Sequence, residues 1–209
     1  MARLDALGAI TETPGVLTRR YLTPAHAAAM QQVQAWMRAA GMRTRISAVG
    51  NVIGRYEGRH ANAPALLLGS HIDTVPEGGP LDGALGVLAG LECLQTIKAA
   101  GLDTRRPLAV VAWSDEEGRY GSLFGSRAFT GKLDLAEVPK LQAVDGIRLV
   151  DAMARAGYDA GRVAEARCDP RTLHAYIELH IEQGPHLEAA RLPIGLVEGI
   201  VGIRRNRLT

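Results

Sequence analysis

The sequence predicts an α/β fold with a largely parallel sheet, and three observations support this fold class. The chain of 209 residues is 47% hydrophobic, which supplies enough apolar side chains for a packed core. Two continuous apolar runs, at 65–70 and 108–113, flank a segment with helical periodicity at 83–100. This order is that of a β-α-β unit, which places both strands parallel in one sheet. A third segment, 174–182, alternates apolar and polar residues as a strand does.

The N-terminal elements are predicted to be a helix and a hairpin. Thr23 is expected to cap a helix that has Pro24 at its first position and ends at Gly41. Apolar residues recur along this helix at helical spacing: Ala27, Met30, Val33, Met37 and Ala40. Residues 43–57 then predict two strands joined by a Gly-Asn turn.

The β-α-β unit follows. The strand at 65–70 is expected to be buried on both faces, because its apolar residues are continuous. A loop rich in glycine and proline covers 73–83, and the helix after it ends at Gly101. The second strand is expected to end before Ser114.

Two further helices are predicted at 122–130 and 147–156. The strand at 174–182 presents four apolar side chains on one face: Ala175, Ile177, Leu179 and Ile181. Residues 194–209 predict extended chain with exposed Ile200, Val201 and Ile203, and with solvated arginines at 204, 205 and 207.

Composition excludes several classes of function. The 24 basic and 22 acidic side chains give a net charge of +2, so we expect no nucleic-acid partner. No apolar run approaches the ~20 residues that span a bilayer, so no membrane partner is expected. The first residues lack the basic-then-apolar layout of an export signal, which predicts a cytoplasmic protein. Cys93 and Cys168 are expected to be free thiols.

Chemistry-bearing residues follow both strands of the β-α-β unit. The carboxyl ends of parallel strands meet at one sheet edge, where ligands bind. The candidates at this edge are His71, Asp73, Asp82, Glu116 and Glu117. The later strand at 174–182 adds one imidazole, that of His180. Such nitrogen and oxygen donors suit zinc, manganese or cobalt. Asp73 is placed to accept the other ring N–H of His71, and one of the adjacent glutamates is free to take a proton from water.

Taken one at a time, these residues also fit simpler interpretations. Asp115-Glu116-Glu117 alone is typical of a solvated acidic turn, and a lone histidine is typically a satisfied polar residue; their joint placement favours a metal site. A serine triad at Ser70 and His71 is disfavoured, because neighbours in a strand face opposite sides. Glu178 and Glu182, on the same strand face as His180, are expected to be polar lining. The remaining histidines, His26, His60, His174 and His186, have no supporting context.

Three motifs together resemble one family. GSHIDTVPEGGPLDGALGVLAGLE, WSDEEGRYGSLFGSRAFTG and ELHIEQGPHLE resemble the hydantoinase/carbamoylase branch of the di-zinc aminoacylase/carboxypeptidase-G superfamily. The resemblance implies a three-layer α-β-α domain with a mixed, largely parallel sheet. It also implies two divalent metal ions, with zinc as the first choice and manganese or cobalt as alternatives. The implied activity is hydrolysis of a ureido or carbamoyl C–N bond in allantoate or an N-carbamoyl-L-amino acid, which releases ammonia and carbon dioxide.

The resemblance also implies a role for each motif residue. His71 and His180 are implied ligands of one metal, Glu117 of the other, and Asp82 the bridge between them. Asp73 is implied to orient His71, and Glu116 to be the general base. Gln183 resembles a substrate-facing group.

Members of the resembled family are longer and homodimeric. The resemblance therefore implies that residues 1–199 are the first part of the catalytic domain and that 200–209 begin a dimerisation or lid domain. The last histidine ligand is expected outside this sequence, so the 209 residues alone are expected to lack turnover. Two alternatives remain: a non-catalytic remnant, and an aminoacylase or dipeptidase that uses the same metal site.

Overall fold

The computed structural model describes residues 1–200 and has a five-stranded mixed sheet at its centre. The strands are β1 (Arg43–Ile46), β2 (Val52–Tyr56), β3 (Ala65–His71), β4 (Leu108–Trp113) and β5 (Leu173–Ile177), in the order β1-β2-β4-β3-β5. The three strands β4, β3 and β5 are parallel, while β1 and β2 add an antiparallel hairpin at one edge. The predicted α/β fold, its hairpin and its parallel β-α-β unit are therefore confirmed.

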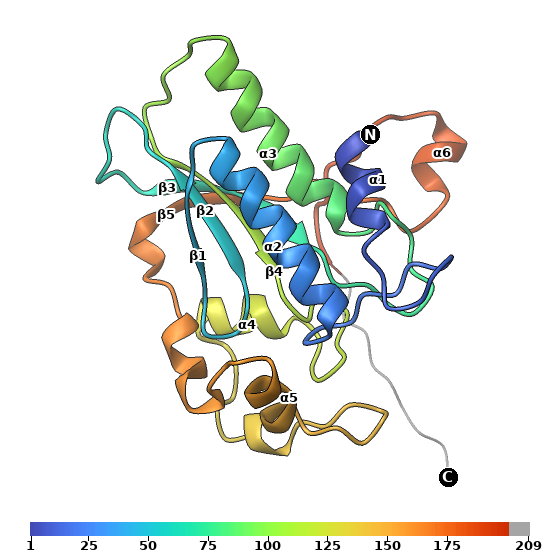
Figure 1. Cartoon of the computed structure of the whole chain (residues 1–209). Helices are drawn as coiled ribbons and strands as arrows, with labels where there is room; N and C mark the ends of the chain where they lie inside the picture. Colours follow the sequence, from blue (N-terminus) through green and yellow to red (C-terminus); the bar gives the residue numbers. More distant parts are fainter. Residues whose placement is uncertain (201–209) are drawn as a thin grey trace.

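Helices cover the sheet on both faces (Figure 1). The α-helices are α1 (Ala2–Gly8), α2 (Pro24–Ala39), α3 (Ala84–Ala99), α4 (Phe124–Thr130), α5 (Leu149–Arg155) and α6 (His186–Ala190). Three short 3-10 helices are η1 (Val138–Lys140), η2 (Ala160–Ala166) and η3 (Pro170–Thr172). Within residues 1–200, no helix combines the length and apolar character that crossing a membrane demands.

The main core lies between the sheet and the two long helices. Met37 of α2 and Leu91 of α3 pack in one buried cluster with Val110 of β4. Thr23 accepts a hydrogen bond from the His26 N–H and so begins α2 at Pro24, as the sequence predicts. On the opposite face, Phe129 of α4 packs against Trp113. The sheet is therefore the middle layer, and its two covered faces hold β3 and β4 in place.

A smaller core lies at the sheet end around α4 and α5. Phe124, Leu149 and Met153 form it together with Tyr21 from the N-terminal segment. Cys93 and Cys168 are free thiols, as expected.

The C-terminal part differs from the prediction. The predicted strand at 174–182 ends at Ile177, and residues 178–182 have no regular structure. Its apolar face is also exposed: Ile177 is 53% and Leu179 is 42% accessible. The cause is that β5 is an edge strand over which no helix of residues 1–200 packs closely. Glu178, His180 and Glu182 are therefore not on one strand face.

Two α-helices, α1 and α6, were not predicted. They have seven and five residues, too short for a clear periodic pattern. Ile194 and Ile200 are exposed, in agreement with the expected extended end. The predictions for Val201, Ile203 and the terminal arginines, and for almost all of the proposed second domain at 200–209, lie outside the described residues.

Candidate metal centre

The first candidate ligand, His71, stands at the carboxyl end of β3 and is 1% exposed. Its Nδ1 lies 2.9 Å from the backbone oxygen of Asp73, which fixes the ring and leaves Nε2 as the available donor atom. Nε2 lies 3.7 Å from Asp82 Oδ1 and 3.6 Å from Glu116 Oε2. The imidazole therefore points its free nitrogen at two carboxylates.

Asp82 reaches this position through an unusual backbone turn just before α3. Gly83 has φ +65° and ψ −49°, and the Ala84 N–H donates to the Asp82 oxygen at 2.7 Å. A Cβ at Gly83 would lie 2.5 Å from the His71 ring. Glycine at 83 is therefore what allows the Asp82 carboxylate and the His71 imidazole to lie together.

His180 completes a cluster of three donors. Its Nε2 is 3.2 Å from Asp82 Oδ1, its Nδ1 is 2.9 Å from the Ile181 oxygen, and its ring stacks on His71 at 5.7 Å. The donor atoms of His71, Asp82 and His180 all lie within 4.8 Å of one another. Bonds of about 2.0–2.2 Å in a tetrahedral site separate donor atoms by roughly 3.3 Å. The observed spacing thus fits a single divalent cation.

The paired glutamates Glu116 and Glu117 lie in the turn that follows β4. Asp115, at φ +51°, accepts hydrogen bonds from the backbone N–H groups of Arg119, Tyr120 and Gly121 and so shapes this turn. The turn places Glu116 and Glu117 in a second donor group with His71. Burial and the nearby charges of Asp82, Glu116 and Asp73 together raise the pKa of Glu117 to about 7, against an opposing effect of His71. A cation here would relieve this repulsion among carboxylates.

Asp73 is buried and connects the two halves of the site. Its Oδ2 accepts the Glu117 N–H at 3.1 Å, and its Oδ1 lies 3.8 Å from His71 Nδ1. Desolvation raises the pKa of this carboxyl to about 7. The sequence predicts that the carboxylate holds the His71 ring; in the structure the backbone carbonyl of Asp73 makes that contact instead.

Gln183 lies beside the donor cluster. Its Nε2 donates to the two Asp82 oxygens at 3.3 and 3.4 Å, and the side chain is exposed. All seven residues singled out in the sequence thus lie in one region at the carboxyl ends of β3 and β4.

The residues set aside in the sequence lie elsewhere or face other partners. The Ser70 hydroxyl contacts Glu178, so no serine triad forms with His71. Glu182 accepts the Leu187 N–H. His26 packs against Tyr21, and burial lowers its pKa to about 3.

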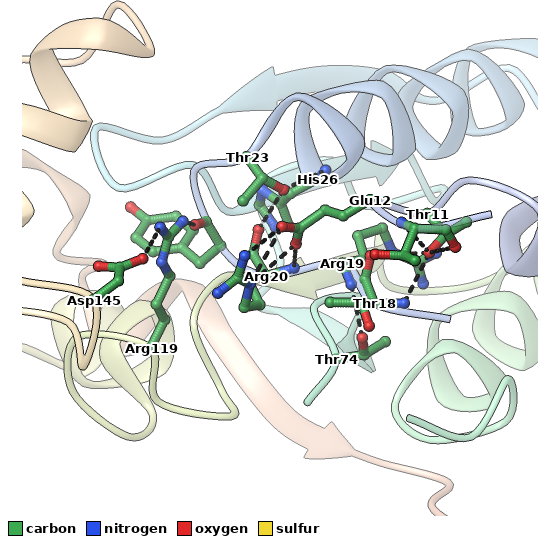
Figure 2. Close-up of polar contacts among 12 residues, drawn as sticks. Thr11, Glu12, Thr18, Arg19, Arg20, Thr23, His26, Thr74, Arg119 and Asp145 are labelled. Carbon is green, nitrogen blue, oxygen red and sulfur yellow. Dashed lines mark hydrogen bonds and ion pairs between the residues drawn. The ribbon is translucent and has the colours of Figure 1, made fainter. Parts of the chain in front are cut away.

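Arg19 is a supporting residue that the sequence did not reveal (Figure 2). It is 1% exposed, and its guanidinium donates to three backbone oxygens, those of Leu7, Ile10 and Ile72. Its own N–H donates to Thr74 Oγ1, and the Thr74 N–H donates to its oxygen. Arg19 therefore holds the segment on either side of Asp73. In the sequence it is one of two adjacent arginines, a pattern typical of surface.

Comparisons with known proteins agree with the motif resemblance. A model of peptidase family M20/M25/M40 matches residues 67–204. An N-carbamoyl-L-amino acid amidohydrolase of Geobacillus stearothermophilus is 45% identical over 96% of this chain and 50% of its own length. Allantoate deiminase 2 of Glycine max is 38% identical over 100% of this chain and 44% of its own.

A solved structure shares the fold as well. The hydantoinase/carbamoylase family amidase of Burkholderia ambifaria superposes with a TM-score of 0.81 at 40% identity, over 91% of this chain and 46% of that one. The chain thus spans about half the length of the curated relatives it matches.

Proposed function

Because the chain belongs to peptidase family M20/M25/M40, we propose that the protein is a metal-dependent amidohydrolase acting on a small ureido compound. The proposed substrates are an N-carbamoyl-L-amino acid or allantoate, the compounds named for its relatives. Water would cleave the carbamoyl C–N bond and give ammonia, carbon dioxide and the free amine.

The observation that carries this proposal is the meeting of His71, Asp82 and His180 beside Glu116 and Glu117. Two imidazoles and three carboxylates at one sheet edge form a donor set for zinc, with manganese or cobalt as alternatives. His71, Asp82 and His180 would hold one cation, and Asp82 and Glu117 would contribute to a second.

The chemistry that such cations supply is polarisation of a carbonyl and a lowered pKa of bound water. The chain itself supplies the proton transfer. Glu116, 31% exposed at its side chain, is placed to accept the proton of the attacking water and to deliver it to the leaving nitrogen. Gln183 would orient the substrate from the exposed side, and Asp73 would keep His71 and Glu117 in register.

The test measures hydrolysis by the protein purified from its natural source and, in parallel, by the 209-residue chain. We expect ammonia from N-carbamoyl-L-amino acids or allantoate, and much slower cleavage of N-acetyl amino acids and dipeptides. Cleavage of only the last two would instead support an aminoacylase or peptidase, which the family name keeps open.

Two variants test the separate roles of the adjacent glutamates. Glu116→Gln is expected to abolish turnover and keep the bound metal, whereas Glu117→Ala is expected to lose metal from one site. Equal metal loss in both variants, or activity that survives Glu116→Gln, would contradict this assignment.

The cytoplasmic location, the homodimer and the division at residue 199 belong to the same proposal. The homodimer and the division at residue 199 follow from the resemblance, and all three are tested by fractionation, sedimentation and limited proteolysis.

A further inference from the structure

His180 lies beyond the last paired residue of the sheet. The ladder between β3 and β5 ends at the pair Leu68 and Ile177, three residues before His180. From residue 178 to residue 185, the backbone has no regular structure. The position of His180, and of Gln183 after it, must therefore be set by something other than strand pairing.

A hydrogen-bond network of side chains continues where the ladder stops. Glu178 Oε1 accepts the hydroxyl of Ser70 at 2.5 Å, and Glu178 Oε2 accepts the hydroxyl of Tyr176 at 2.9 Å. The Tyr176 oxygen in turn accepts the indole N–H of Trp113 at 2.9 Å. One carboxylate thus joins β3, β4 and β5.

Each anchor of this network lies next to a candidate ligand. Ser70 directly precedes His71, Trp113 ends β4 just before the turn to Glu116, and Glu178 lies two residues before His180. Two of the anchors are firmly held, because Ser70 is 0% and Trp113 is 7% exposed. The network therefore attaches the segment that carries His180 to two buried strands, β3 and β4.

We propose that Glu178 is a positioning residue that fixes His180 to the ends of β3 and β4 through Ser70 and Tyr176. That this role matters for metal binding rests on the proposed function. That Glu178 orders residues 178–183 is independent of the proposed function.

The test compares Glu178→Ala with Glu182→Ala in the 209-residue chain. Both variants truncate a glutamate within the same motif, but Glu182 accepts the Leu187 N–H at the start of α6 and does not touch the network. Cobalt or zinc affinity is measured by chelator competition. We expect Glu178→Ala to weaken it about 10-fold, as loss of a ligand-orienting contact does. Glu182→Ala is expected to stay within about 2-fold of the parent chain.

Two measurements without metal test the ordering itself. Backbone order parameters of residues 178–183, from NMR relaxation, should fall in Glu178→Ala, while those of β3 stay high. The indole N–H resonance of Trp113 should shift in Tyr176→Phe, where its acceptor is gone, and the resonance of Trp36 should not move.

A double-mutant cycle completes the design. Ser70→Ala and Glu178→Ala remove two ends of one bond, so the double variant should bind metal no more weakly than Glu178→Ala alone. Unchanged metal affinity and unchanged order parameters in Glu178→Ala would overturn the inference. If the parent chain bound no cobalt or zinc, the proposed function would fail, and the order parameters would still decide the role of Glu178.

Discussion

At the scale of single residues, the candidate site depends on close approaches that only certain side chains allow. Gly83 lets the Asp82 carboxylate reach the His71 ring, and Asp73 joins His71 to Glu117 through its backbone oxygen and its carboxylate. The donor types and their positions at strand ends could be predicted from the sequence, because they follow local patterns. The contact by the Asp73 carbonyl could not, because it depends on how the chain turns after β3.

Gly83→Ala is expected to disrupt the site. The variant places a Cβ 2.5 Å from the His71 ring and forces a strained backbone turn on alanine, at a cost of about 1–3 kcal/mol. Urea unfolding and zinc competition measure the effect. Gly79→Ala, in the same loop, is the matched control, since no atom lies within 4 Å of its added Cβ. Equal results for the two variants would show that Gly83 has no special role.

The buried carboxyl groups predict how stability changes with pH. Burial raises the pKa of Asp73, Asp115 and Glu117 to about 7, from 3.8, 3.8 and 4.5. Because these pKa values are higher in the folded chain, the stabilisation is complete below pH 4 and is lost as pH rises through 7. The metal-free chain should therefore be less stable at pH 8 than at pH 6 by at least about 1 kcal/mol. Urea midpoints at both pH values test this.

Glu117→Gln isolates one contribution to that pH dependence. The variant cannot ionise at 117, so its stability should fall less between pH 6 and pH 8 than that of the parent chain. An unchanged difference would mean that Glu117 does not titrate in this range.

At the scale of elements, the β-α-β unit could be predicted well and the ends of the chain could not. The apolar runs of β3 and β4 are continuous because both faces of these strands are covered, a property written into the local sequence. The strand β5 is shorter than its alternating pattern suggests, because pairing depends on a neighbour as well as on alternation. Helices α1 and α6 are too short to show a period.

Residues 17–19 have no regular structure, but they support the site. The Leu17 oxygen and the Thr18 hydroxyl accept the Gly78 and Glu77 N–H groups, next to the contacts of Arg19. Segment 17–19 thus lies along the loop between β3 and Asp82. Burial lowers the pKa of Arg19 to about 10, so this guanidinium remains charged at neutral pH.

Arg19→Met is expected to destabilise the chain by about 2–4 kcal/mol, because it removes the guanidinium donor from the backbone oxygens of Leu7, Ile10 and Ile72. Arg20→Met is the matched control. Arg20 forms a partly exposed ion pair with Glu12, and such pairs contribute at most about 1 kcal/mol. Denaturant unfolding of both variants tests the difference, and similar losses would contradict the proposed support by Arg19.

At the scale of the whole molecule, metal binding should appear as stability. A cation that binds only the folded chain stabilises it by about 2.7 kcal/mol at a concentration of 100 Kd. Zinc is therefore expected to raise the unfolding temperature of the 209-residue chain, and a chelator should reverse the rise. Combined His71→Ala and His180→Ala substitution should abolish the shift. A shift that survives both substitutions would place the metal elsewhere.

The order of the ligands along the chain has a consequence for biosynthesis. His71, Asp82, Glu116 and Glu117 all leave the ribosome well before His180, which arrives only with the segment after β5. A nascent chain can therefore assemble β3, α3 and β4 while one corner of the donor cluster is still absent. Tight metal retention would begin only when residues 178–183 dock, so metal binding would follow the folding of the β-α-β unit and would not nucleate it.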